Sequence, residues 1–146
     1  MFCSNGNSSY RKHKDSLSNI LSTKEFVVNF VTSETKKQMN HTSRDFKPND
    51  DEFIFSKLKK KKSKLIKVPA VKNSPVNLEC KLSKIIKLKT NSDKVSTMII
   101  GEVIGIFINN KFIKKDRIDS VSMNYLGRMG YSEYTKISTK FNLKRS

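Results

Sequence analysis

Residues 74–88 read SPVNLECKLSKIIKL, and this stretch decides the fold class. From Val76 onward, apolar and polar side chains alternate with the two-residue period of a half-buried strand. The sequence TNSD at 90–93 has turn chemistry, and residues 95–108 form a second long apolar run. Strand, turn and strand in this order predict an antiparallel hairpin, so we expect a mainly β chain.

The second strand of this hairpin carries glycines as well as branched apolar residues. The two-residue period puts Gly101 and Gly105 together on one face. It puts five apolar side chains on the other face: Met98, Ile100, Ile104, Ile106 and Ile108. Small residues on a strand permit close approach of another backbone or of a ligand. We therefore expect such an approach on the face that the two glycines share.

Upstream of the hairpin, the pattern predicts short elements joined by polar loops. The expected elements are a helix ending near Thr23, a strand over 25–31, a helix capped by Thr32 or Ser33 that runs to about Met39, and a return to the core at 51–55. Residues 1–3 are too few for a strand of their own, and 117–146 read as irregular or partly helical. No repeat and no second domain is visible, so residues 1–146 are interpreted as one domain.

The chain is strongly basic, with a net charge of +17 from 30 Lys and Arg against 13 Asp and Glu. A field of this sign attracts anions such as nucleic acid, acidic lipid or phosphorylated cofactors. Lys greatly outnumbers Arg, however, and Asn, Ile and Ser are abundant, which fits a codon bias equally well. The lysine-dense run 57–67 contains no aromatic residue to stack a base, so it favours a solvated loop or edge over nucleic-acid binding.

Other functional classes lack their sequence signals. No apolar run reaches the length of a membrane span, and the N-terminus does not read as a signal peptide, so we expect a cytoplasmic protein. The two cysteines and two histidines (Cys3, Cys80, His13 and His41) do not form a metal-ligand cluster, and we predict no metal. No catalytic side chain can be assigned, but a protein whose cofactor carries the chemistry needs none.

Residues 11–20 read RKHKDSLSNI, where a Ser- and Asn-rich loop enters a helix. Four basic or potentially basic side chains and a hydroxyl gather there. The N–H groups and the dipole of a helix N-terminus also favour an anion. One interpretation is therefore a phosphate site. The other is an ordinary helix start, capped by Asp15 or Ser16, with solvated lysines around it.

Six stretches of the chain follow one another in a recognisable order. They are KDSLSNI at 14–20, EFVVN at 25–29, MN at 39–40 with DEF at 51–53, SPVNLEC at 74–80, GEV at 101–103, and LGRMGYSEY at 126–134. Taken together they resemble the flavin reductase-like family, the FMN-binding split barrels. The resemblance implies a β-barrel of six antiparallel strands with flanking helices. It also implies a homodimer with FMN bound near the subunit interface.

The resemblance also implies an activity and a set of site residues. The activity is reduction of flavin by NADH or NADPH. The alternatives are a non-catalytic flavin-binding or electron-transfer protein of the same fold, and an inactive fragment. Lys14, Ser16 and Asn19 fall where the family contacts the FMN phosphate and ribityl end; Ser4 and Arg11 are helpers, and Arg128 and Tyr134 are candidates near the flavin or the dimer contact. Asp15 is assigned to capping, and Glu79 and Glu102 to structure.

The chain departs from the family pattern in three places. It begins partway into the pattern, so we expect the first strands to be missing, along with the Ser- and Phe-rich segment that lines the flavin ring. Phe107 stands where many members have His, and Tyr131 stands where the family often has its second Gly. A barrel without its first strands is expected to expose sheet edges.

Overall fold

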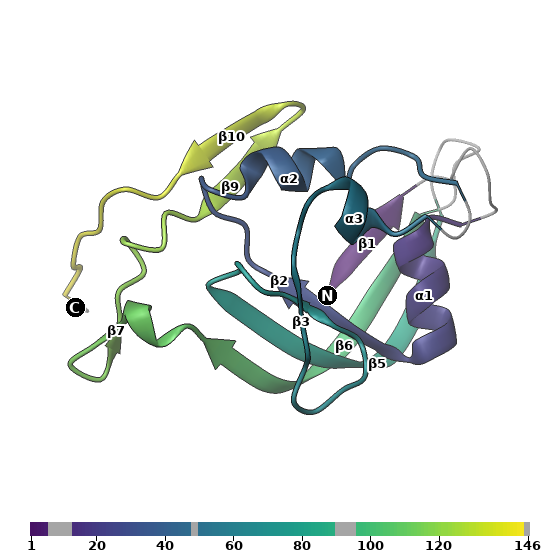
Figure 1. Cartoon of the computed structure of the whole chain (residues 1–146), viewed down its shortest axis with the longest axis horizontal. Helices are drawn as coiled ribbons and strands as arrows, with labels where there is room; N and C mark the ends of the chain where they lie inside the picture. The colour runs from purple at the N-terminus through teal and green to yellow at the C-terminus, as the bar shows by residue number, and fades with distance from the viewer. Residues whose placement is uncertain (6–12, 48–49, 90–95, 145–146) are drawn as a thin grey trace.

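The computed structural model describes residues 1–5, 13–47, 50–89 and 96–144, and its centre is one curled antiparallel sheet (Figure 1). The sheet has four strands in the order β1-β6-β5-β2. Their bounds are β1 Phe2–Asn5, β2 Glu25–Asn29, β5 Val76–Leu88 and β6 Ser96–Ile108. This half-barrel confirms the mainly β, split-barrel class. The absence of the first strands stays a prediction.

Smaller elements surround this sheet. They are α1 Asp15–Thr23, α2 Lys36–His41, α3 Glu52–Phe55, β3 Lys60–Lys61, β4 Ala70–Val71, the 3-10 turn η1 Asn110–Phe112, β7 Ile113–Lys114, β8 Arg117–Ile118, β9 Leu126–Gly130 and β10 Glu133–Lys136. The last six strands named form three two-stranded ribbons: β3 with β4, β7 with β8, and β9 with β10. Within the described part of the chain, no helix has both the length and the apolar character needed to span a bilayer.

The predicted hairpin is confirmed, since β5 and β6 pair antiparallel along their length. The turn predicted at 90–93 lies outside the described residues. The pairing register shifts twice, between Glu79 and Cys80 and between Leu82 and Lys84. Bulges of this kind increase the local twist of a sheet. They account for the curl of the hairpin in Figure 1.

The expectation that Gly101 and Gly105 share one face is wrong. Glu79 pairs with Gly105 while Cys80 pairs with Val103, so β6 holds one extra residue between the two glycines. A Cβ added to Gly101 would lie 2.3 Å from the ring of Phe26, whereas one added to Gly105 would lie 2.7 Å from Leu65. Each glycine therefore leaves room for a different side chain of this protein, Phe26 beside Gly101 and Leu65 beside Gly105.

Two short segments near the N-terminus also differ from expectation. Residues 2–5 form β1, because the edge of β6 supplies the hydrogen-bonding partners that so short a segment needs. The Phe2 ring packs edge-on against Phe26, with ring centroids 5.7 Å apart. Helix α2 begins after Thr35 rather than after Thr32 or Ser33, because Thr32 forms a β-bridge with Tyr125.

Two further expectations concerned the middle and the tail of the chain. Residues 52–55 form the short helix α3, but Ile54 and Phe55 point largely to solvent and do not join the core. The tail is neither irregular nor helical at 126–136, where β9 and β10 form a hairpin. The sequence lacked a clear alternating pattern here, because most of these side chains are exposed on both faces of the ribbon.

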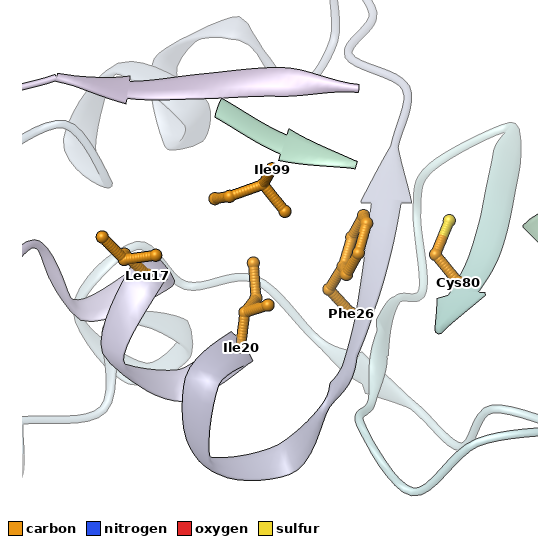
Figure 2. Packing of buried hydrophobic residues seen from close by; sticks show 5 residues of the cluster. All are labelled: Leu17, Ile20, Phe26, Cys80 and Ile99. Carbon is orange, nitrogen blue, oxygen red and sulfur yellow. The ribbon is translucent and has the colours of Figure 1, made fainter. Parts of the chain in front are cut away.

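The core lies between α1 and the sheet (Figure 2). Leu17 and Ile20, one turn apart on α1, point toward Phe26 of β2 and Ile99 of β6, and Cys80 of β5 completes the cluster. Residues three or four apart share one helix face, so burying this face leaves the opposite face of α1 exposed. The core thereby fixes which side chains of α1 can meet a ligand.

Candidate functional site

Helix α1 starts within the basic stretch 11–20, where the sequence predicted a helix to begin. Lys14 occupies the N-cap position with an extended backbone, and Ser18 N–H donates the first intrahelical bond, 3.1 Å to the Lys14 carbonyl. Asp15 and Ser16 are the first two helical residues, so the expectation that one of them is the N-cap is wrong. N–H groups ahead of the intrahelical ladder point out of the helix end, where the dipole favours negative charge.

The exposed face of α1 carries the predicted polar side chains. Ser16 and Asn19 are exposed, one turn apart, directly beside the buried pair Leu17 and Ile20. Thr23 lies a further turn along, with its hydroxyl donating to the Asn19 carbonyl at 2.8 Å. The structure therefore brings Lys14, Ser16 and Asn19 together on one end and one side of the helix.

Three hollows adjoin this face, with volumes of about 660, 500 and 230 Å³. Ser16 lines all three, Asn19 lines the two larger ones, and Lys14 lines the smallest. The 660 Å³ hollow has an apolar floor that includes Phe26 and Val28. Sites for small molecules and cofactors usually span roughly 300 to 1,000 Å³, with a few polar groups on mostly apolar walls. The 660 Å³ hollow has this character.

Basic side chains that the sequence analysis did not single out also line these hollows. Arg44 shares the smallest hollow with Lys14, and Lys67 lines the largest. Lys47 and Lys60 line the 500 Å³ hollow. No local pattern marked them, because Arg44 and Lys47 lie in a polar loop, and Lys60 and Lys67 belong to a lysine run that reads as a solvated edge. Only the folded chain places them opposite α1.

Acidic side chains stand among these cations. Lys60 Nζ donates to Asp51 Oδ2 at 2.5 Å, and this hydrogen bond holds the pKa of Asp51 below its usual value. Glu52 lines both smaller hollows. Burial, followed by the charges of Asp15 and Asp51, raises the pKa of Glu52. The smallest hollow therefore carries both signs of charge: the cations of Lys14 and Arg44, and the carboxyl groups of Asp15, Asp45 and Glu52.

The raised pKa of Glu52 predicts how stability depends on pH. A carboxyl with a raised folded-state pKa stabilises the fold below its unfolded pKa, and this contribution is lost as pH rises through the folded pKa. Glu52→Gln should therefore raise the free energy of unfolding more near pH 7 than near pH 4, about the pKa of a free glutamate. Urea unfolding at both pH values measures the difference. The exposed Glu34→Gln is the control, and an equal gain at both pH values would contradict the assignment.

The other predicted site residues lie elsewhere. Ser4 is buried in β1 opposite Thr97 and lines none of the three hollows, and Arg11 lies outside the described residues. Arg128 and Tyr134 face each other on the β9–β10 hairpin, with the guanidinium 5.7 Å from the ring centroid. Along the long axis of the molecule, this hairpin is far from α1 (Figure 1). The roles suggested for these four residues stay predictions.

The described part of the chain does not contain a cluster of metal-binding side chains. Among residues 1–5, 13–47, 50–89 and 96–144, no three His, Cys, Asp or Glu side chains come together in a way that could hold a metal ion.

Known proteins resemble this chain in sequence and in structure. The family model described as Flavin reductase like domain matches residues 1–127. An uncharacterized protein from Aquifex aeolicus is 32% identical over 136 residues, which cover 90% of this chain and 65% of that protein. The chain thus spans just under two thirds of the length of this curated relative.

Two solved structures share the fold at somewhat lower identity. Nitrilotriacetate monooxygenase component B from Bacillus cereus matches with a TM-score of 0.83 and 26% identity, covering 97% of this chain and 70% of that one. The 2-nitrobenzoate 2-nitroreductase NbaA from Pseudomonas fluorescens matches with a TM-score of 0.77 and 28% identity, covering 91% and 65%.

Proposed function

The chain belongs to the flavin reductase-like family, and from this we propose that it binds FMN and reduces it with NADH or NADPH. The observation that carries the proposal is the convergence of Lys14, Ser16 and Asn19 on hollows at the N-terminal end of α1. The similarity to a monooxygenase component and to a nitroreductase, at 26% and 28% identity, supports a redox role.

The residues around α1 fit the phosphate end of FMN. A phosphate dianion requires cations, hydroxyls and N–H donors together, and charge-assisted hydrogen bonds are the strong ones. Lys14 supplies a cation and Ser16 a hydroxyl at the helix start, and Arg44 adds a second cation to the smallest hollow. Asn19, one turn further on, offers an amide for the ribityl hydroxyls.

The protein's part in the reaction would be binding and orientation. Flavin supplies the hydride acceptor, so no nucleophile or acid is required from the chain. The mostly apolar 660 Å³ hollow next to Asn19 offers a surface that excludes water from a planar ring. Holding two reactants in one geometry can itself lower the barrier, by about 7 to 11 kcal/mol in well-oriented intramolecular cases.

We also propose that two copies associate. Large apolar side chains on the β9–β10 hairpin and the tail are open to solvent: Met129, Tyr131, Phe141 and Leu143. Exposed apolar side chains that gather into one patch usually mark an interface. A second copy that covers these side chains would form the predicted homodimer. Sedimentation analysis measures the association.

Titration of the purified protein with FMN tests the proposal. Flavin fluorescence should be quenched to saturation, and NADH or NADPH added without oxygen should then bleach the bound flavin. If FMN binds but neither dinucleotide bleaches it, the non-catalytic flavin-binding or electron-transfer alternative is correct. A protein that takes up no FMN at micromolar concentrations would exclude both, since that affinity is about 8 kcal/mol of binding free energy.

A further inference from the structure

The loop that joins β3 to β4, residues 62–69, has the form of a compact clasp. Its two ends are paired as strands, Lys60 with Val71 and Lys61 with Ala70. Inside it, the Ser63 hydroxyl donates to the Val68 carbonyl at 2.5 Å. Loops whose ends lie close together and that are packed by their own side chains are frequently functional. We call this segment the β3–β4 loop.

The buried carboxylate of Glu79 binds two backbone N–H groups of this loop. Glu79 of β5 is only 2% exposed, and its two oxygens accept backbone N–H groups from Lys64 at 2.9 Å and Leu65 at 2.7 Å. The Leu65 side chain is 53% exposed, so its own burial does little to fix this part of the loop. Burying a carboxylate is costly unless it is hydrogen-bonded, so loop and carboxylate stabilise each other.

Further polar side chains of the sheet hold this loop and the two short strands that flank it. Glu25 of β2 accepts the Lys67 N–H at 2.8 Å. The Asn77 amide, 1% exposed, accepts from Lys61 Nζ at 2.7 Å and donates to the Val71 carbonyl at 3.3 Å. Asn77 and Glu79 lie on the side of β5 that the alternating pattern assigned to solvent. The expectation of a half-buried strand is therefore wrong here, because the β3–β4 loop covers this side.

The far side of the loop forms a wall of the candidate cofactor site. Lys67, Val68 and Pro69 line the 660 Å³ hollow together with Ser16 and Asn19 of α1. Val68 and Pro69 also line the 500 Å³ hollow. The core fixes α1 on the sheet, so the position of the loop determines the width of the space between them.

We propose that Glu79 is a positioning residue of the flavin site: through the Lys64 and Leu65 N–H groups, it fixes the β3–β4 loop at the distance from α1 that FMN requires. This inference rests on the proposed function. In this proposal, Glu79 does not contact the flavin and acts only through the backbone of the β3–β4 loop.

Hydrogen exchange and FMN titration together test this positioning role. In the flavin-free wild type, the Lys64 and Leu65 amides should exchange slowly although their side chains are exposed. Glu79→Gln removes one carboxylate acceptor, so exchange at 62–69 should accelerate while the β5–β6 hairpin stays protected. The dissociation constant for FMN should rise about tenfold, the scale of one lost charge-assisted hydrogen bond.

Two variants complete the design. Glu102→Gln alters an exposed carboxylate on the neighbouring strand, opposite Lys81, and should change neither measurement. Ser63→Ala removes only the hydrogen bond from Ser63 to Val68 inside the loop and leaves the sheet intact, so it provides the test if Glu79→Gln does not fold. It should accelerate hydrogen exchange in the loop and raise the dissociation constant for FMN about threefold.

Unchanged loop exchange in Glu79→Gln would overturn the proposal. Faster exchange in the loop of either Glu79→Gln or Ser63→Ala, with an unchanged dissociation constant for FMN, would overturn it as well. If the wild type binds no FMN, the proposed function fails instead, while exchange still reports whether Glu79 holds the loop.

Discussion

Replacing both Lys14 and Ser16 with alanine should weaken FMN binding about a hundredfold and riboflavin binding less than about threefold. The two ligands differ only in the phosphate. Lys14 and Ser16 lie at the start of α1, where cation, hydroxyl and N–H donors converge on the smallest hollow. Two hydrogen bonds to a charged group, at about 1.5 kcal/mol each, account for a change of this size.

Both ligands must be measured in the same buffer. At 0.1 M ionic strength, salt screens the interaction between exposed charges that lie more than about 10 Å apart, so the measured affinity for a charged ligand depends on the salt concentration. Ser22→Ala combined with Lys37→Ala is the matched control, since both side chains are exposed and neither lines the hollows beside α1. The control should leave both affinities unchanged. Equal losses for FMN and riboflavin in the Lys14 and Ser16 variant would exclude the phosphate role.

Ile99→Ala should lower the free energy of unfolding by about 3 kcal/mol, within the range of large-to-small substitutions in packed cores. Ile99 is fully buried and packs with Leu17 and Ile20, the side chains that seat α1 on the sheet. Its strand pairs with β1 on one side and β5 on the other, so neither neighbour can readily collapse into the cavity. The substitution therefore removes both apolar contacts and the support of the site helix.

Ile106→Ala is the control for this prediction, because Ile106 lies on the same strand but is 63% exposed. It should cost less than about 1 kcal/mol, as surface substitutions usually do. Urea unfolding followed by circular dichroism measures both values, with unchanged m-values showing that two-state behaviour holds. Equal costs for the two variants would show that the core does not lie where the structure places it.

The sequence was sufficient for features that depend on local periodicity. The alternation from Val76 onward and the long apolar run at 95–108 predicted the hairpin at the centre of the sheet. The basic loop-to-helix stretch also identified the region where α1 begins. These predictions hold because strand and helix periods act over neighbouring residues.

Features set by distant contacts could not be predicted in this way. Residues 2–5 became a strand only because β6 offered an unpaired edge, and the extra residue in β6 separated Gly101 from Gly105. The same limit applies to the polar side chains of the site. Lys67 is one lysine among many in the sequence, and only the ties from Glu25 and Glu79 place its loop opposite α1.

The most direct measurement of the central claim is an amide NMR titration of the labelled protein with FMN and then, separately, with riboflavin. We expect the N–H signals of Ser16 and Leu17, at the start of α1, to shift strongly with FMN and much less with riboflavin. Saturable FMN binding that leaves these two signals in place, or that moves them equally with both ligands, would contradict the claim.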